Sequence, residues 1–261
     1  KIKVPLGKSK EFLIELNKII KKKKIDLVIP TVDEEIINIY KDKSLHSITH
    51  IPSQTFIRKT MDKFILIKEL KNLKFRVPKT YLSCNKNIPF PKKYIIKPRY
   101  GRGSKNVHYI KKKINIKNYL ELYNYNCKDV IVQEYISGTE YTIFVGMNKN
   151  QKINKIFPFK IKKKKGITIS GISNNEKRVI NFVKKFSKKF QTNNSYNIQL
   201  ILSSGKIYPI EVNPRISTTF FLTLLDGHDP FFSRNDKKIN KLFLAQKKIS
   251  LDRYWENIIT K

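Results

Sequence analysis

Apolar residues recur at helical spacing in several separate stretches of the chain. In the first of these stretches Phe12, Leu13, Leu16 and Ile19 lie one, three or four positions apart, which is typical of a helix that buries one face. The other stretches repeat this pattern. Helices are predicted at residues 10–24, 60–73, 118–125, 176–190 and 220–225, and after a cap at Thr31 or Asp33.

Short apolar runs between these helices predict strands. Ser204 and Gly205 predict a tight turn between the last two strands, and the consecutive lysines 162–165 predict a loop. Helices and strands mixed in this way predict an α/β (α+β) protein. The predicted strands are residues 25–30, 94–97, 107–110, 130–133, 140–146 and 152–159, and those that carry Gln199 and Glu211.

The strand that ends at residues 207–215 carries the most informative polar pattern. Glu211, Asn213 and Arg215 lie two positions apart, so in extended structure their side chains share one face. Hard oxygen ligands beside a fixed cation suit a complex of magnesium with a polyphosphate. A strand-end turn with solvated polar groups explains the same residues without a ligand, so this pattern needs support from elsewhere in the chain.

That support comes from the strand at residues 94–97, which runs into a loop of glycine and serine. Gly101 and Gly103 permit positive φ and close approach of the backbone, so the loop amides could surround a phosphate. Lys97 would stand at the end of the strand as a point charge for the same anion. A plain hairpin turn is the alternative for this loop.

Four motifs in this order make the chain similar to the ATP-grasp superfamily, and above all to the ATP-grasp domain of the large subunit of carbamoyl phosphate synthetase. The resemblance covers residues 26–229. The motifs are Asp62-Lys63, Lys97-Pro98 with the loop 101–104, the segment 133–140, and Gln199 with the segment 211–215.

The resemblance implies an ATP-grasp fold, in which two α+β lobes clasp ATP. A partial Rossmann-like domain would precede these lobes and occupy residues 1–57. The small lobe, with the glycine-rich phosphate loop, would span residues 58–134. The large lobe, with the metal and phosphate site, would span residues 135–261.

The resemblance also implies an ATP-binding group of residues. Lys63 and Lys97 would hold the α- and β-phosphates, although solvated surface lysine is a serious alternative in so lysine-rich a chain. The loop that closes over the phosphates would consist of Gly101, Gly103 and Ser104 with their neighbours. The adenine and ribose contacts would come from Gln133, the backbone of Glu134, Tyr135 and Ile136, and the carboxylate of Glu140.

A metal site and a transfer site follow from the same resemblance. Glu211 and Asn213 would be ligands of Mg²⁺ or Mn²⁺, with Gln199 as a neutral ligand where many relatives have an acid. The residues that would act on the transferred phosphoryl group are Arg215, Lys97 and Arg102. Another phosphate contact would come from Lys160 or one of the lysines 162–165; the sequence does not choose among them, and Lys164 alone is expected to matter little.

The net charge of +35 first suggests a nucleic-acid-binding protein. Only eight of the 55 basic residues are arginine, however, and the lysines are scattered without a recognisable nucleic-acid motif. We therefore expect no specific nucleic-acid partner. No apolar run approaches the roughly 18–20 residues of a membrane span, and two cysteines are too few for a disulfide framework. A cytoplasmic protein is expected, and a homodimer is left open.

These features together predict an ATP-dependent carboxylate-amine or carboxylate-thiol ligase, carbamoyl-phosphate-synthase-like, that acts through an acyl phosphate. Carbon–nitrogen bond formation is the favoured chemistry. The partners would be ATP, a small carboxylate and a small amine whose identities the motifs do not specify. Two alternatives remain: a basic nucleic-acid-binding protein, and a nucleotide-binding module that has lost catalysis. Stabilisation by nucleotide would exclude the first.

Overall fold

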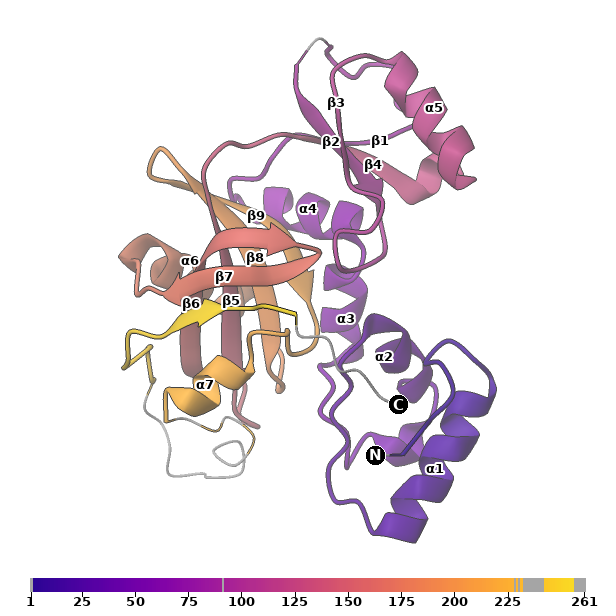
Figure 1. The fold of residues 1–261 in the computed structure, drawn as a ribbon, viewed down its shortest axis with the longest axis vertical. Coiled ribbons are helices and arrows are strands. Elements are labelled where there is room, and N and C mark those ends of the chain that lie inside the picture. The colour runs from indigo at the N-terminus through magenta and orange to yellow at the C-terminus, as the bar shows by residue number, and fades with distance from the viewer. Residues whose placement is uncertain (1, 91, 228, 230, 232–241, 256–261) are drawn as a thin grey trace.

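Two antiparallel sheets form the framework of the molecule (Figure 1). The four-stranded sheet has the order β1-β4-β2-β3 and the six-stranded sheet the order β10-β7-β6-β5-β8-β9. The computed structural model describes residues 2–90, 92–227, 229, 231 and 242–255. None of the helices in these described residues is long and apolar enough to cross a membrane.

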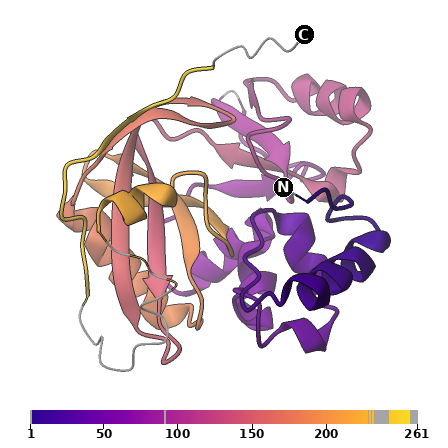
Figure 2. The same ribbon diagram turned by 60° about the horizontal axis from the view of Figure 1, so that its bottom comes forward.

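The first part of the chain is helical and has a small core of its own (Figure 2). Its elements are α1 (Glu11–Lys23), α2 (Asp33–Ile39) and the 3₁₀ helix η1 (Lys43–Leu45). Phe12 of α1 packs with Ile36 and Ile39 of α2, so each helix buries one apolar face in this core. The following helix, α3 (Gln54–Thr60), leads toward the sheets.

The strand predicted at residues 25–30 is wrong. Ile25 and Leu27 are exposed, and only Val28 forms an isolated parallel bridge, with Thr49. The first described strand starts at Thr80, so this segment has no neighbouring strand to complete a ladder. The predicted caps of α2, Thr31 or Asp33, are also wrong. The N-cap residue is Val32, and the Glu35 carboxylate accepts from the backbone N–H groups of Thr31 and Val32.

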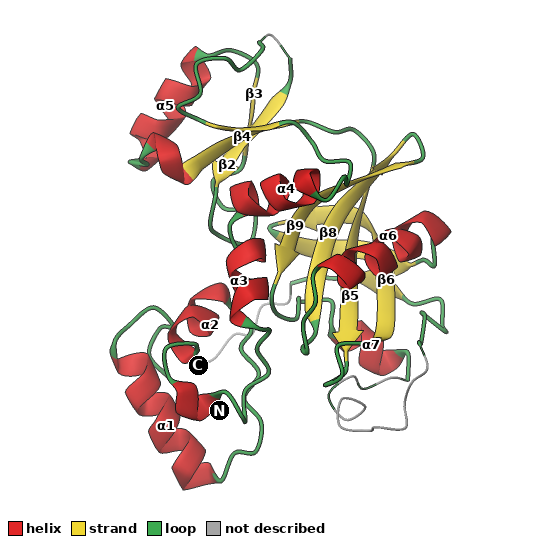
Figure 3. Ribbon diagram, turned by 180° about the vertical axis from the view of Figure 1, so that it is seen from behind, coloured by secondary structure: helices red, strands yellow, loops and turns green. Residues whose placement is uncertain are grey.

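The four-stranded sheet carries one helix on its face (Figure 3). Tyr94 and Ile96 of β2 pack with Val130 and Val132 of β4 and with Tyr119 of the helix. The chain therefore folds into a small lobe whose central strand, β2, carries Lys97. The elements of this lobe are β1 (Thr80–Leu82), β2 (Tyr94–Pro98), β3 (His108–Ile110), α5 (Ile114–Tyr123), the 3₁₀ helix η2 (Cys127–Asp129) and β4 (Val130–Glu134).

The helix predicted at residues 60–73 is shorter in the structure. It is α4 (Lys63–Asn72), and Asp62 caps it by accepting from the N–H groups of Phe64 and Ile65 at 2.9 and 3.3 Å. Leu66 and Leu70 of α4 pack in the core of the six-stranded sheet. The predicted small lobe (residues 58–134) includes this helix, whereas its apolar face packs against the large lobe. The proposed domain boundaries themselves stay a prediction.

The six-stranded sheet is the larger lobe, and α6 covers one of its faces (Figure 3). Val179, Val183 and Phe186 of α6 pack on Ile143 of β5 and Ile198 of β8. The elements of this lobe are β5 (Thr139–Met147), β6 (Ile153–Lys165), β7 (Ile167–Ser173), α6 (Lys177–Lys189), β8 (Tyr196–Ser203), β9 (Lys206–Asn213), α7 (Phe221–Leu225) and β10 (Ser250–Asp252).

The lysine-rich loop predicted at residues 162–165 is also wrong, because β6 continues through it. Lys164 lies opposite Thr168 of β7, and Lys165 lies opposite Ile167. The backbone there is paired as a hairpin, whereas lysine side chains on both faces hide the alternation that identifies a strand. The hairpin turns at Gly166, whose φ is +71°. Strands β7 and β10 were not predicted.

The predicted turn at Ser204 and Gly205 is confirmed. Both residues have positive φ, at 45° and 74°, and they join β8 to β9. The hairpin places Gln199 directly opposite Glu211, and the register shifts between Gln199 and Leu200. The amide and the carboxylate therefore lie side by side on the sheet that faces the small lobe.

Candidate functional site

Two neighbouring clefts lie where the two sheets face each other. The first has a volume of about 420 Å³ and is lined by α4, β2, the β2–β3 loop, β5, β8 and β9. The second, of about 280 Å³, is lined by β6, β7, β8, β9 and the segments 31–32 and 217–219. Their common wall consists of Arg102, Lys164, Gly166, Gln199 and Glu211.

Lys63 joins the small lobe to the large one at the first cleft. Its Nζ donates to the carbonyl oxygen of Gly101 at 2.8 Å and pairs with Glu211 Oε1 at 3.2 Å. Asp62 anchors this end of α4, because its carboxylate forms an ion pair with Arg99 and accepts from the hydroxyl of Tyr100. The buried ammonium of Lys63 is therefore held at a fixed place in the cleft.

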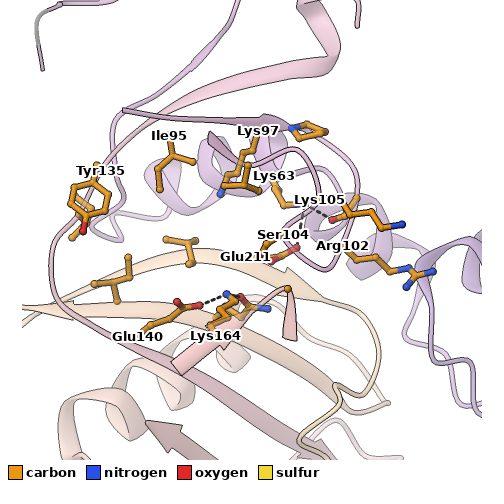
Figure 4. Close-up of a pocket in the computed structure, with 18 of the residues that line it drawn as sticks. Lys63, Ile95, Lys97, Arg102, Ser104, Lys105, Tyr135, Glu140, Lys164 and Glu211 are labelled. Atoms are coloured by element: carbon orange, nitrogen blue, oxygen red, sulfur yellow. Dashed lines mark hydrogen bonds and ion pairs between the residues drawn. The ribbon is translucent and has the colours of Figure 1, made fainter. Parts of the chain in front are cut away.

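Lys97 projects from β2 into the same cleft, as Figure 4 shows. Its Nζ donates to Gln133 Oε1 at 2.9 Å. Burial disfavours the charged form and the nearby Lys63 repels it, so the pKa of Lys97 falls to about 8 although Glu211 acts in the opposite direction. At neutral pH the side chain is still mostly protonated and can attract an anion.

Glu211 is the acid of the common wall. Burial raises its pKa, but the charges of Lys63 and Lys97 outweigh burial and hold that pKa below its usual value. The carboxylate therefore stays ionised at neutral pH inside a cleft rich in cations. An ionised, half-buried carboxylate facing two lysines is the arrangement expected where a metal and a polyphosphate meet.

Lys164 lies on the opposite side of the cleft, at the end of β6. Its Nζ forms an ion pair with Glu140 and donates to Gln199 Oε1 at 3.0 Å (Figure 4). Three lysines from three separate elements thus converge on the first cleft. The expectation that Lys164 matters little is wrong in its premise, because Lys164 lines both clefts.

The glycine loop covers the first cleft from the small lobe. Gly101 and Gly103 have φ values of +127° and +67°, which favour glycine, and a Cβ added at Gly166 would lie 3.0 Å from the carbonyl oxygen of Gly103. The loop therefore touches the β6–β7 hairpin of the large lobe. Ser104, also with positive φ, lines the cleft.

Both arginines assigned to phosphoryl transfer contact the N-terminal part of the chain. Arg102 pairs with Glu34 at 3.2 Å, and Figure 4 shows its guanidinium turned away from Glu140 and Lys164. Arg215 Nε donates to Asp33 Oδ1 at 2.6 Å. Neither contact was predicted, since each joins segments far apart in the sequence. Arg215 lines the second cleft, and Arg102 lines both.

Gln133 differs from the sequence expectation. Its amide oxygen accepts from Lys97, and its amide nitrogen donates to Thr80 Oγ1 at 2.9 Å. The side chain is 2% exposed and fixes Lys97, so it is not free to accept a hydrogen bond from adenine. The side chain of Glu134 accepts from the backbone of Lys79 and also lies outside the cleft lining.

The end of the first cleft beyond Glu140 is apolar. Tyr135 and Ile136 line it together with Ile95 and Ile201. The N–H group of Tyr135 donates to the carbonyl of Lys93, so of the two neighbours only Ile136 keeps a backbone N–H without a hydrogen bond within the described chain. A flat aromatic base would match such a slot in shape and polarity.

Oxygen donors suitable for a divalent metal line the second cleft. Glu211 supplies a carboxylate, and Gln199 and Asn213 supply amide oxygens, all of which are hard ligands that Mg²⁺ accepts. Each now faces a cation of the chain: Glu211 faces Lys63 at 3.2 Å, Gln199 faces Lys164 at 3.0 Å, and Asn213 faces Arg215 at 3.5 Å. These oxygens therefore fit a bound cation.

One carboxylate and two amides are a weak donor set on their own. Among the described residues there is no group of three or more His, Cys, Asp and Glu side chains that could hold a metal. A divalent metal in this cleft would take its remaining oxygens from a bound phosphate or from water, as magnesium usually does.

Most residues that the sequence singled out line one of the two clefts. Reasoning from the sequence missed Tyr100, Lys105 and Tyr109, which line the first cleft, and the threonines of the second. Tyr100 and Lys105 are neighbours of the predicted loop, so extending that loop by one residue on each side would have included them. The threonines carry no motif.

Comparison with known families agrees with this architecture. A family model described as "ATP-grasp domain" matches residues 60–219. The D-alanine--D-alanine ligase of Petrotoga mobilis is 31% identical over 172 residues, which are 59% of this chain and 57% of the ligase. The tyramine--L-glutamate ligase of Methanocaldococcus fervens is 26% identical over 230 residues, 84% of this chain and 68% of that ligase.

A solved structure with a similar fold is the biotin carboxylase domain of the 2-oxoglutarate carboxylase from Hydrogenobacter thermophilus, a dimer in complex with MgADP, ADP and bicarbonate. It superposes with a TM-score of 0.72 at 15% identity and covers 92% of this chain and 60% of that one. At that identity the likeness concerns the fold. The chain spans little more than half of the Petrotoga ligase.

Proposed function

The chain belongs to the ATP-grasp family, and from that premise we propose that it is an ATP-dependent ligase that joins a small carboxylate to an amine through an acyl phosphate. The observation that carries this proposal is the convergence of Lys63, Lys97 and Lys164 on Glu211 at the wall shared by two clefts. The first cleft, at about 420 Å³, lies within the usual volume range of ligand pockets, and the second shares a wall with it.

ATP would occupy the first cleft. The base would lie in the apolar slot beside Tyr135, where the N–H of Ile136, which has no hydrogen-bond partner among the described residues, would donate to a ring nitrogen. Glu140 would accept from the ribose hydroxyls, and Lys63 and Lys97 would hold phosphate oxygens as charge-assisted donors. The loop that contains Gly101, Gly103 and Ser104 would cover the phosphates.

Glu211, Asn213 and Gln199 would hold Mg²⁺, or Mn²⁺ in its place. The metal would neutralise charge on the β- and γ-phosphates. The neutral Gln199 leaves one full negative charge on the wall, so affinity for the free metal should be low and should depend on bound nucleotide. The lysines that now satisfy these oxygens would turn to the phosphates.

The second cleft would hold the carboxylate substrate. An oxygen of this carboxylate would attack the γ-phosphorus, the bond to the β-phosphate oxygen would break, and ADP would leave. An amine would then attack the acyl carbon and release phosphate. Arg215 faces this cleft and would stabilise the negative charge of the transferred group.

An amino acid is the class of carboxylate substrate that we favour. The second cleft has a volume of about 280 Å³ and is lined mainly by polar side chains and cations, which suits a small polar acid rather than a long apolar one. The two curated relatives carry the names of ligases that act on amino acids. A closer kinship with carbamoyl phosphate synthetase, a thiol acceptor, a cytoplasmic location and a homodimer stay predictions.

A phosphate-release screen tests the proposal. Pairs of amino acids and amines are offered to the full-length protein with Mg-ATP, and the Glu211→Ala variant is the control. We expect phosphate release that needs both substrates and the metal, and that Glu211→Ala lacks. Nucleotide binding without release for any pair would favour the catalytically inactive module. Absence of any Mg-ATP effect on the melting temperature would contradict nucleotide binding itself.

A further inference from the structure

Arg215 lines the second cleft but not the first, and its guanidinium is held on two sides. Nε donates to Asp33 Oδ1 at 2.6 Å, and Nη1 donates to the carbonyl oxygen of Ile216 at 3.1 Å. Within the described residues, the one hydrogen bond of Nη2 is a long contact of 3.5 Å to Asn213 Oδ1. The nitrogen that is least satisfied is therefore the one that faces the predicted metal ligand.

Asp33 is itself well fixed. It is the first residue of α2, and Ile36 and Ile39 of this helix are buried in the N-terminal core. Glu35 holds the preceding backbone by accepting from the N–H groups of Thr31 and Val32. The carboxylate that contacts Arg215 therefore belongs to a segment that is held in place by core packing.

The neighbouring acid makes a much weaker contact of the same kind. The side chains of Asp33 and Arg215 are 15% and 11% exposed, whereas those of Glu34 and Arg102 are both 43% exposed. Solvent screens the second pair, and exposed pairs contribute little. Asp33 and Glu34 are adjacent in one helix turn, and Asp33 forms the less exposed ion pair while Glu34 forms the more exposed one.

We propose that Asp33 is a positioning residue for the ligase reaction: it orients the guanidinium of Arg215 toward the second cleft, so that the N-terminal segment is a working part of the site. The inference rests on the proposed function, because it assigns a task to Arg215 in that reaction. It adds a residue that lies outside residues 60–219, the part that the family model matches.

The physical reason is the freedom of an arginine side chain. A guanidinium on a flexible stem must lose rotamer freedom before it can bind an anion, and a prior contact on Nε removes that cost in advance. Asp33 contacts one edge only, so Nη2 remains available to an incoming oxygen. Without Asp33, binding of an anion at Arg215 should weaken by roughly tenfold, as expected for the ordering of one long side chain.

Inorganic phosphate is a suitable probe, because it is a product of the proposed reaction and would meet Arg215 in the second cleft. Its affinity is measured by calorimetry in the presence of saturating Mg-ADP. We expect Arg215→Ala and Asp33→Ala to weaken phosphate binding by about tenfold each, and the double variant to be no weaker than Arg215→Ala. Asp33→Asn keeps an oxygen for Nε and should recover part of the affinity.

Glu34→Gln is the matched control and should change phosphate affinity by less than about twofold. If Asp33→Ala binds phosphate as tightly as Glu34→Gln does, or more tightly than the wild type, the inference is overturned. The same outcome follows if the effects of Asp33→Ala and Arg215→Ala add in the double variant. Mg-ADP affinity is measured for every variant. A wild-type protein that does not bind Mg-ADP would contradict the proposed function rather than the role of Asp33.

Discussion

The two clefts obtain their cations in different ways. In the first, Lys63, Lys97 and Lys164 are paired with Glu211, Gln133 and Glu140, which all lie between residues 63 and 211. In the second, Arg215 is paired with an acid of the N-terminal segment, as is Arg102, which lines both clefts. The proposed nucleotide half of the site is thus self-contained, whereas the proposed acceptor half depends on a long-range contact.

This difference leads to an expectation about mutations. Changes at the self-contained half should impair nucleotide binding, and changes at the N-terminal contacts should leave nucleotide binding intact. Substitutions in each half of the site test that separation.

Glu211→Ala should have the largest effect, because Glu211 belongs to both clefts. The variant loses its candidate metal ligand and leaves Lys63 without its carboxylate partner. We expect phosphate release to fall on the order of 10³-fold, and the effect of Mg²⁺ on ATP affinity to disappear. Steady-state phosphate release and calorimetry with and without Mg²⁺ measure the two effects. A variant that keeps its Mg²⁺ dependence would remove Glu211 from the metal site.

Lys97→Met should weaken Mg-ATP binding by about 10- to 100-fold, the usual range for a lost charge-assisted hydrogen bond. The pKa of Lys97 is lowered to about 8 by burial and by its cationic neighbours. The wild type should therefore lose ATP affinity as the pH rises above 8, by up to about tenfold per unit, since the unbound lysine gives up the proton that phosphate binding requires. Lys97→Met should lack this loss between pH 7 and 9, and an identical pH profile in both proteins would assign the titration elsewhere.

Lys164→Ala should reduce Mg-ATP affinity by roughly tenfold. Beyond losing a cation, the variant leaves the Glu140 carboxylate in the proposed nucleotide cleft without its ion pair. Lys163→Ala is the matched control, because Lys163 is exposed on the same strand. Calorimetric titration of Mg-ATP into both variants measures the two affinities. Equal losses would mean that the bulk charge of the protein attracts the nucleotide.

Glu34→Gln should have the smallest effect. The Glu34–Arg102 pair is half exposed, and such pairs contribute less than about 1 kcal/mol. Mg-ATP affinity should stay within about twofold of the wild-type value, and the midpoint of urea unfolding should hardly change. A loss of nucleotide affinity as large as that of Lys97→Met would end the separation between the two halves.

The same contrast decides what could be read from the sequence. The predicted ATP-grasp fold is confirmed by the family model and by similar solved structures. Lys63, Lys97, Gln199 and Glu211 could be placed together because each lies in a local motif on a strand or at the start of a helix. The order of these motifs along the chain carried the information.

Contacts between residues far apart in the sequence could not be predicted. The ion pair between Asp33 and Arg215 joins residues 182 positions apart, and no motif marks it. The buried hydrogen bond from Lys97 to Gln133 changed the expected role of Gln133, since a side chain that satisfies a neighbour cannot also read a base. Residues 162–165 were misread because lysines on both faces of a strand hide its period.

The most direct test of the central claim is a calorimetric titration of ATP into the wild type and Glu211→Ala, each with Mg²⁺ and with EDTA. Convergence of the three lysines on Glu211 predicts one ATP site in the wild type, tightened by Mg²⁺, and no such tightening in the variant. Equal titration curves for the two proteins under both conditions would contradict it.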